Sequence, residues 1–123
     1  MGLIGPETFR EFFSEEIDAL SERYGGIGIH CCADAEHQFE NFYNVKNLKL
    51  MNLYRPPESI RAAYKLFARR CVQCHGTLTN GRAAALPFDV NETYPAGSRI
   101  IFREYAEDID DARRLLERYN VKR

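Results

Sequence analysis

The sequence predicts an α/β fold of about four parallel β/α units, forming a C-terminal half-barrel of the TIM (β/α)8 type. Short runs of β-forming residues alternate with amphipathic helical patterns along the chain. The 123 residues are about half of the roughly 250 that a closed barrel of this type requires. We therefore expect a single domain over residues 1–123, whose open strand edges are covered by further chain or by a partner.

Helical periodicity is clearest near the N-terminus. One helix is expected to begin near Pro6 and to end at Gly25-Gly26, with apolar residues at helical spacing: Phe9, Phe12, Phe13, Ile17, Leu20 and Tyr24. Further helices are expected over residues 35–42, 58–68 and 109–119. Asp34 and Asp108 precede the first and the last of these helices, so each is predicted to cap its helix.

Four segments have the composition of short strands. They are residues 27–32, 48–54, 71–76 and 99–105. The segment between the last two strands is rich in turn-forming residues and predicts a long loop. Strands that alternate with helices form βαβ units with right-handed crossovers, and their carboxyl ends meet at one edge of the sheet. Chemistry is expected at that edge.

Composition narrows the classes of function. The formal net charge is −1 and no basic block stands out, which argues against a nucleic-acid partner. No apolar run is long enough to span a bilayer, and the N-terminal segment lacks the pattern of a secretory signal. We therefore expect a cytoplasmic protein without membrane contact, whose four cysteines are thiols or metal ligands rather than disulfides.

Two clusters of residues that commonly bind metals lie at the ends of predicted strands: His30-Cys31-Cys32 at the first strand and Cys74-His75 at the third. His30 and Cys32 end the first strand, and because side chains alternate along a strand they share a face, with Cys31 opposite. An imidazole and a thiolate so placed are a plausible zinc pair. A catalytic zinc requires a third protein ligand, for which Cys74 is the first candidate and His75 the second.

Other residues are expected to line the same mouth or to be structural. Asn52 and Arg55 lie near the end of the second strand, and Glu104 lies near the end of the fourth. Cysteine is among the most often buried residue types, so Cys31 and Cys71 are read as core thiols. In a competing interpretation all the cysteines pack in a core and none binds a metal.

The segment Cys71-Val72-Gln73-Cys74-His75 also matches the C-x-x-C-H pattern of c-type haem attachment. Such a haem needs a second axial ligand, yet no histidine and no methionine follows His75. Both methionines, Met1 and Met51, precede the pattern, and the β/α alternation is foreign to small all-helical cytochromes. A haem protein is therefore kept as a remote alternative.

The segment "GIGIHCCADAEHQFENFYNVKNLKLMNL" and the later "CVQCHG" resemble the C-terminal part of the uroporphyrinogen decarboxylase superfamily. This superfamily includes cobalamin-dependent methyltransferases of the methylcobamide:coenzyme M type. The opening "GPETFREFFSEEIDAL" is similar to the helix that precedes this strand in the family. The resemblance implies a TIM barrel, with zinc bound by a His-x-Cys pair and by a distant cysteine.

His30 and Cys32 fall on the His-x-Cys positions. The family's third ligand follows the last strand, where this chain reads "IIFREYAEDID" and holds no cysteine. Cys74, His75 or Glu104 would have to replace it. The decarboxylase branch further requires N-terminal arginines and an aspartate that lie outside this chain.

Three hypotheses follow. In the first, the chain is part of a zinc-dependent enzyme that transfers a methyl group from a partner-borne corrinoid to a thiol, or of a related decarboxylase acting on a tetrapyrrole. The fragment alone would be inactive, and its partner would be the missing N-terminal half or a second copy. In the second, the chain is a non-catalytic association domain with core cysteines. The third is the haem protein.

Overall fold

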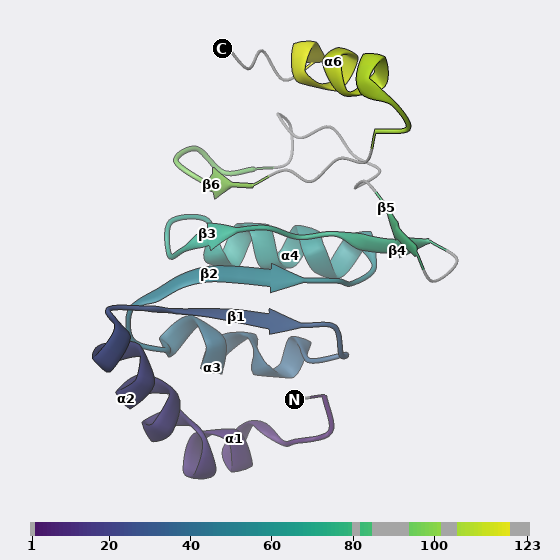
Figure 1. Ribbon diagram of the computed structural model, residues 1–123. Helices are drawn as coiled ribbons and strands as arrows, with labels where there is room; N and C mark the ends of the chain where they lie inside the picture. Colours follow the sequence, from purple (N-terminus) through teal and green to yellow (C-terminus); the bar gives the residue numbers. More distant parts are fainter. Residues whose placement is uncertain (1, 80–81, 85–93, 102–105, 119–123) are drawn as a thin grey trace.

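The computed structural model describes residues 2–79, 82–84, 94–101 and 106–118 (Figure 1). Its centre is a four-stranded, entirely parallel sheet in the order β1-β2-β3-β6. The strands are β1 (Ile27–Cys31), β2 (Leu48–Leu53), β3 (Val72–Gln73) and β6 (Arg99–Ile100). Helices separate the first three strands in sequence, so the predicted α/β class with parallel strands is confirmed.

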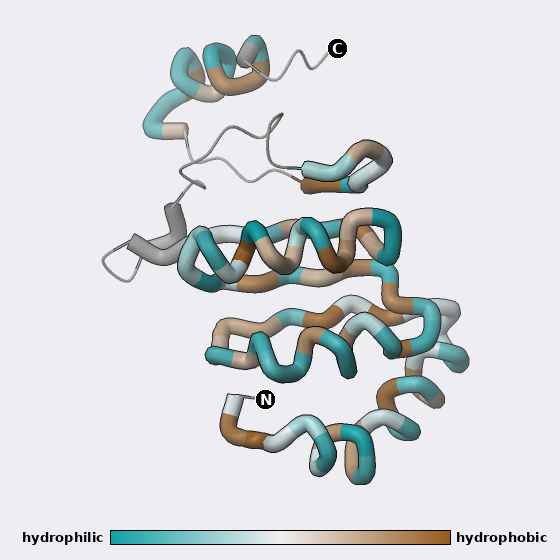
Figure 2. The backbone as a smooth tube through the Cα atoms, turned by 180° about the vertical axis from the view of Figure 1, so that it is seen from behind, coloured by the Kyte–Doolittle hydropathy of each residue, from teal (hydrophilic) through white to brown (hydrophobic). Residues whose placement is uncertain are grey.

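The helices are α1 (Pro6–Phe12), α2 (Ser14–Tyr24), the 3₁₀ turn η1 (Glu36–Gln38), α3 (Phe39–Asn44), α4 (Pro57–Phe67) and α6 (Ile109–Arg118). Figures 1 and 2 show the sheet from opposite sides, and in both views α3 and α4 lie on the same face of it. Within the described ranges, no helix has the length and apolar character needed to cross a membrane.

The core lies between the sheet and these helices. Phe9 from α1, Phe42 from α3 and Phe67 from α4 are fully buried. The rings of Phe9 and Phe42 meet edge to face, with centroids 5.8 Å apart. Cys31 and Cys71 belong to the same core at 5% and 0% exposure, which confirms their prediction as core thiols.

The N-terminal helix is two helices, not the single one that the periodicity predicts. The break falls at Phe13, whose φ of −124° leaves the helical range. The Ser14 hydroxyl donates a hydrogen bond to the carbonyl of Phe9 (3.5 Å), a local bond of the kind that competes with a continuous helix. The bend lets Phe9 be buried while Phe13 packs against the edge of the same core.

Two short strands occur at the start of the segment after β3 that the sequence predicts as a long loop. They are β4 (Thr77–Thr79) and β5 (Arg82–Ala84), which form an antiparallel hairpin in which Thr79 pairs with Arg82. The two residues between these strands are Asn-Gly in the sequence, the pair most typical of a two-residue hairpin turn. The loop prediction overlooked this signal.

The two predicted helix caps have different outcomes. The carboxylate of Asp108 accepts hydrogen bonds from the backbone N–H groups of Asp110 (2.9 Å) and Asp111 (2.8 Å), so it caps α6 as expected. The prediction for Asp34 was wrong, because Ala35 holds the cap position of η1 and no side chain caps it. Asp34 instead forms an ion pair with Arg55.

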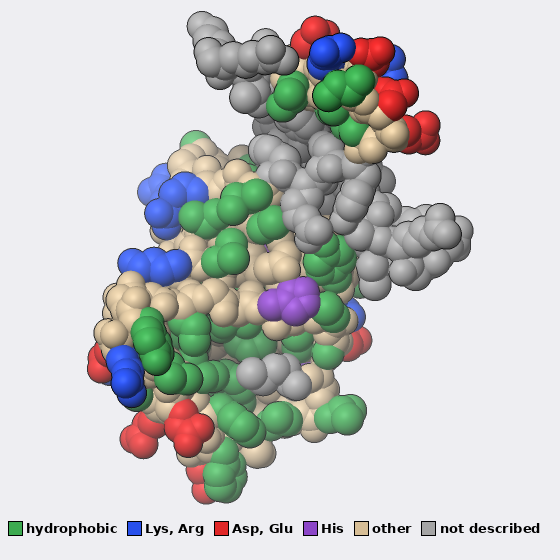
Figure 3. Space-filling model, in the orientation of Figure 1, with side chains coloured by type: hydrophobic (Ala, Val, Ile, Leu, Met, Phe, Trp, Pro, Cys, Tyr) green, Lys and Arg blue, Asp and Glu red, His purple; other side chains and the backbone are tan. Residues whose placement is uncertain are grey.

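The face of the sheet opposite α3 and α4 is turned toward the viewer in Figure 1, and Figure 3 views the molecule from the same side. Along β1, Gly28 and His30 are exposed here, whereas Cys31 points into the core. Asn52 of β2 is half-buried beside them. The carboxyl ends of the strands on this face position the candidate site.

Candidate functional site

His30 and Asn52 face each other across two adjacent parallel strands. They are register partners in β1 and β2. The Nδ1 atom of His30 is 2.5 Å from the Oδ1 atom of Asn52, a short hydrogen bond between the two side chains. The sequence predicted Asn52 only as a lining residue, because strand register cannot be read from the residues alone.

The second ring nitrogen of His30 meets the predicted partner thiol. The Nε2 atom lies 2.7 Å from the Sγ atom of Cys32, and both residues are exposed. The alternation predicted for this segment is confirmed, since His30 and Cys32 share the open face while Cys31 is buried. A thiol, an imidazole and a carboxamide therefore form one hydrogen-bonded line at the carboxyl ends of β1 and β2.

The backbone of Cys74, and not its thiol, is hydrogen-bonded to the Cys32–His30–Asn52 line. The Nδ2 atom of Asn52 donates a hydrogen bond to the carbonyl oxygen of Cys74, in the segment that follows β3. The side chain of Cys74 is buried at 9% exposure. Its position is further fixed by its own backbone N–H, which donates to the carbonyl of Met51 (3.0 Å).

His75 is held inside the protein by both ring nitrogens. Its Nδ1 atom accepts a hydrogen bond from the backbone N–H of Leu53 (3.1 Å), so Nε2 carries the proton and donates it to Oε1 of Gln73 (3.0 Å). Gln73 in turn donates to the carbonyl of Tyr64 (3.2 Å). Burial lowers the pKa of His75 to about 3, so the imidazole is neutral at physiological pH.

The roles of Gln73 and Tyr64 were not predicted from the sequence. Both are buried, and the Tyr64 ring packs on the His75 ring with centroids 4.6 Å apart. A buried glutamine in a short strand, two residues before a histidine, is the signal that would have indicated the network. Neither ring nitrogen of His75 is free to bind a metal unless these bonds break.

His30 and Cys32 supply two donors of types that zinc accepts. Across the described parts of the chain, no three His, Cys, Asp or Glu side chains form a group able to hold a metal ion. Glu104, the predicted rim carboxylate, lies outside the described residues. The structure thus brings together two of the predicted ligands, and neither Cys74 nor His75 completes a three-ligand group.

Arg55, predicted to line the mouth, is engaged by two carboxylates. Its guanidinium lies 2.9 Å from Asp34 and 3.9 Å from Glu36, and its side chain is 15% exposed. Its backbone N–H donates to the carbonyl of Gly76 (3.2 Å). Arg55 therefore connects the end of β2 to the segments that follow β1 and β3.

The C-x-x-C-H pattern is divided between two environments. The Cys71 thiol is fully buried, and burial raises its pKa to about 11. His75 is committed to Leu53 and Gln73. Covalent haem attachment would require Cys71 to leave the core and His75 to give up both bonds, so the geometry favours a packing role for this pattern.

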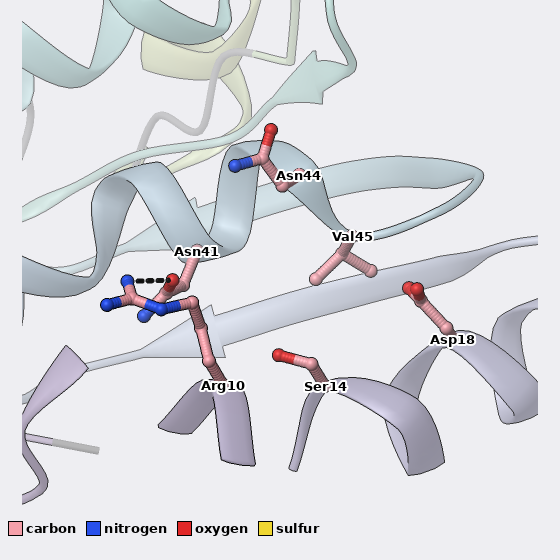
Figure 4. A pocket seen from close by; sticks show the side chains of 6 residues that line it. All are labelled: Arg10, Ser14, Asp18, Asn41, Asn44 and Val45. Atoms are coloured by element: carbon pink, nitrogen blue, oxygen red, sulfur yellow. Dashed lines mark hydrogen bonds between the residues drawn. The ribbon is translucent and has the colours of Figure 1, made fainter. Parts of the chain in front are cut away.

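A pocket of about 260 Å³ opens among the helices, lined by Arg10, Ser14, Asp18, Asn41, Asn44 and Val45 (Figure 4). Arg10 donates a hydrogen bond to Oδ1 of Asn41 (3.2 Å), and Asp18 accepts one from the backbone N–H of Lys46 (2.8 Å). These two bonds join α1 to α3, and α2 to the segment that follows α3. Its lining contains neither a cysteine nor a histidine.

Comparison of the chain with protein-family models, with curated proteins and with solved structures finds no match. The resemblance to the uroporphyrinogen decarboxylase superfamily therefore depends on the motifs quoted above.

Proposed function

We propose that this chain is the C-terminal part of a (β/α)8-type barrel and carries part of a zinc site for methyl transfer from a corrinoid to a thiol. One observation supports this most directly. His30 Nε2 and Cys32 Sγ converge at the carboxyl end of β1, while His30 Nδ1 is held by Asn52. In zinc sites, a ligating histidine similarly bonds through its other nitrogen to an orienting partner.

The donor types fit zinc, although the donor set is incomplete. Two donors on one tetrahedral zinc lie about 3.5 Å apart, given bonds of roughly 2.3 Å to sulfur and 2.0 Å to nitrogen. The observed separation of 2.7 Å would have to widen by about 0.8 Å, within reach of side-chain rotation. Bound zinc would lower the pKa of a coordinated substrate thiol, so that the thiolate forms at neutral pH.

The proposal also requires further chain that completes the barrel and a third donor that completes the zinc site. Four parallel strands are half of what a closed barrel needs, and in the described residues α3 and α4 cover one face of the sheet, whereas buried parallel sheets are normally covered on both faces. An N-terminal half-barrel, or a second copy of this chain, would cover the open face. Glu104 or the covering half would provide the third donor.

Metal content tests the proposal. Protein purified without chelator should hold about one equivalent of zinc by elemental analysis, and His30→Ala and Cys32→Ser should each lose most of it. His37→Ala is the matched control, because His37 is the other exposed histidine. A zinc content below about a tenth of an equivalent in the wild type, unchanged by His30→Ala, would contradict the zinc site.

A second candidate function is favoured by the short contact itself. Cys32, His30 and Asn52 follow the nucleophile, base and orienting-amide order of cysteine hydrolases and acyltransferases. In this reading no metal is needed: His30 accepts the thiol proton as Cys32 attacks an acyl carbon, and returns it to the alcohol or amine that leaves as the acyl-enzyme forms; water then releases the acyl group from Cys32. Zinc-free protein in which His30→Gln slows alkylation of Cys32 would favour this candidate over the first.

A further inference from the structure

The orientation of the Asn52 side chain follows from its two partners. One of its polar atoms faces the backbone carbonyl of Cys74, which can only accept a hydrogen bond. The amide nitrogen must therefore face Cys74, and the carbonyl oxygen Oδ1 must face His30. The backbone carbonyl of Cys74 thus determines that Oδ1 of Asn52, and not its amide nitrogen, faces His30.

The same reasoning extends to the imidazole. Because Oδ1 of Asn52 can only accept, Nδ1 of the neutral His30 ring must carry the proton and donate it. The lone pair then lies on Nε2, the atom 2.7 Å from the thiol of Cys32. Neutral imidazole in water prefers the opposite tautomer, with the proton on Nε2, so the protein has to impose this one.

We propose that Asn52 is a positioning residue that holds His30 as the Nδ1–H tautomer and thereby directs the Nε2 lone pair at Cys32. The assignment deepens the proposed function and depends on it for its purpose, since a zinc ligand and a general base both need that lone pair. The tautomer itself is independent of any metal.

The tautomer can be measured directly in the metal-free protein. Two-bond ¹H–¹⁵N correlation spectra of ¹⁵N-labelled protein, recorded with chelator at about pH 8, distinguish the two ring nitrogens of a neutral histidine. His30 is expected to show a protonated Nδ1, and His75 a protonated Nε2. His75 serves as the internal control, because its Nδ1 accepts from Leu53, the residue after Asn52.

Two variants distinguish a role of Asn52 in orienting the His30 ring from a role in packing alone. Asn52→Leu removes the acceptor, so the His30 population should shift to Nε2–H while the His75 pattern stays unchanged. Asn52→Asp keeps an acceptor for Nδ1–H and should retain the wild-type tautomer. Where zinc binds, Asn52→Leu should weaken its affinity by about 10-fold or more, as loss of such an orienting partner does.

The wild-type spectrum decides first, without any variant. An Nε2–H tautomer at His30 overturns the proposal, and so does an Nδ1–H tautomer that persists in Asn52→Leu. An Nδ1–H tautomer that depends on Asn52, in protein that binds no zinc, supports the positioning role and rejects the zinc-dependent function. The two proposals therefore fail separately.

Discussion

The carboxyl ends of β1 and β3 carry the same two residue types in opposite states. At β1, His30 and Cys32 are exposed and contact each other. After β3, Cys74 and His75 are buried, and both ring nitrogens of His75 are bonded to the protein. The first pair is available for chemistry, and the second stabilises the junction between β2 and β3.

Residue type and strand position are therefore not sufficient to identify a site. The two histidines differ in the side of the sheet to which they point and in whether their hydrogen bonds are exposed or buried. His30 lies on the face of the sheet opposite the buried Cys31, whereas His75 packs against Tyr64 of α4. Burial makes a charged imidazole costly, so His75 is neutral and fully hydrogen-bonded.

The largest expected difference is in thiol reactivity, between the exposed Cys32 directly after β1 and the buried Cys71 directly before β3. In the presence of chelator, iodoacetamide should alkylate Cys32 at least about 10³-fold faster than Cys71, because Cys71 reacts only when its core opens. Mass spectrometry of timed digests measures the rate at each site. Cys32→Ser should remove the fast phase and leave the slow one, and similar rates at the two thiols would contradict the structure.

The next effect is on stability. His75→Ala leaves the N–H of Leu53 without its acceptor and opens a cavity beside Tyr64, so the free energy of unfolding should fall by about 2–4 kcal/mol. His30→Ala, at an exposed position, should cost less than about 1 kcal/mol. Urea denaturation of both variants makes the comparison. Equal losses would show that the two ends are not energetically distinct.

The smallest effect, when it is counted over a single pH unit, is the pH dependence of stability that His75 contributes. Its folded-state pKa of about 3 lies below the ordinary value of 6.5, so between these values the unfolded chain binds a proton that the folded protein does not. The stabilising contribution is fully present above about pH 6.5 and is lost as the pH falls toward 3, by at most about 1.4 kcal/mol per pH unit.

Urea denaturation across this pH range measures the dependence. The difference in unfolding free energy between wild type and His75→Gln should shrink as the pH falls, because the glutamine has no proton to bind. Exposed carboxylates contribute equally to both proteins and cancel in the difference. Parallel pH profiles would contradict the burial of a neutral His75.

Much of the fold could be predicted from local patterns. The apolar periodicity of α4 and the β-forming runs of β1 and β2 were located within a few residues, and the alternation of strands and helices indicated a parallel sheet. The break at Phe13 and the β4–β5 hairpin were missed. The break depends on how Phe9 and Phe13 pack, which spacing alone does not reveal.

That His30 and Cys32 share a face could be predicted from the residues, because side-chain alternation is a property of any strand. That Asn52 lies opposite His30 and bonds to the carbonyl of Cys74, and that His75 is buried, could be seen only in the folded chain. These facts depend on the register between strands and on which face the helices cover. Both are set by contacts between segments far apart in the chain.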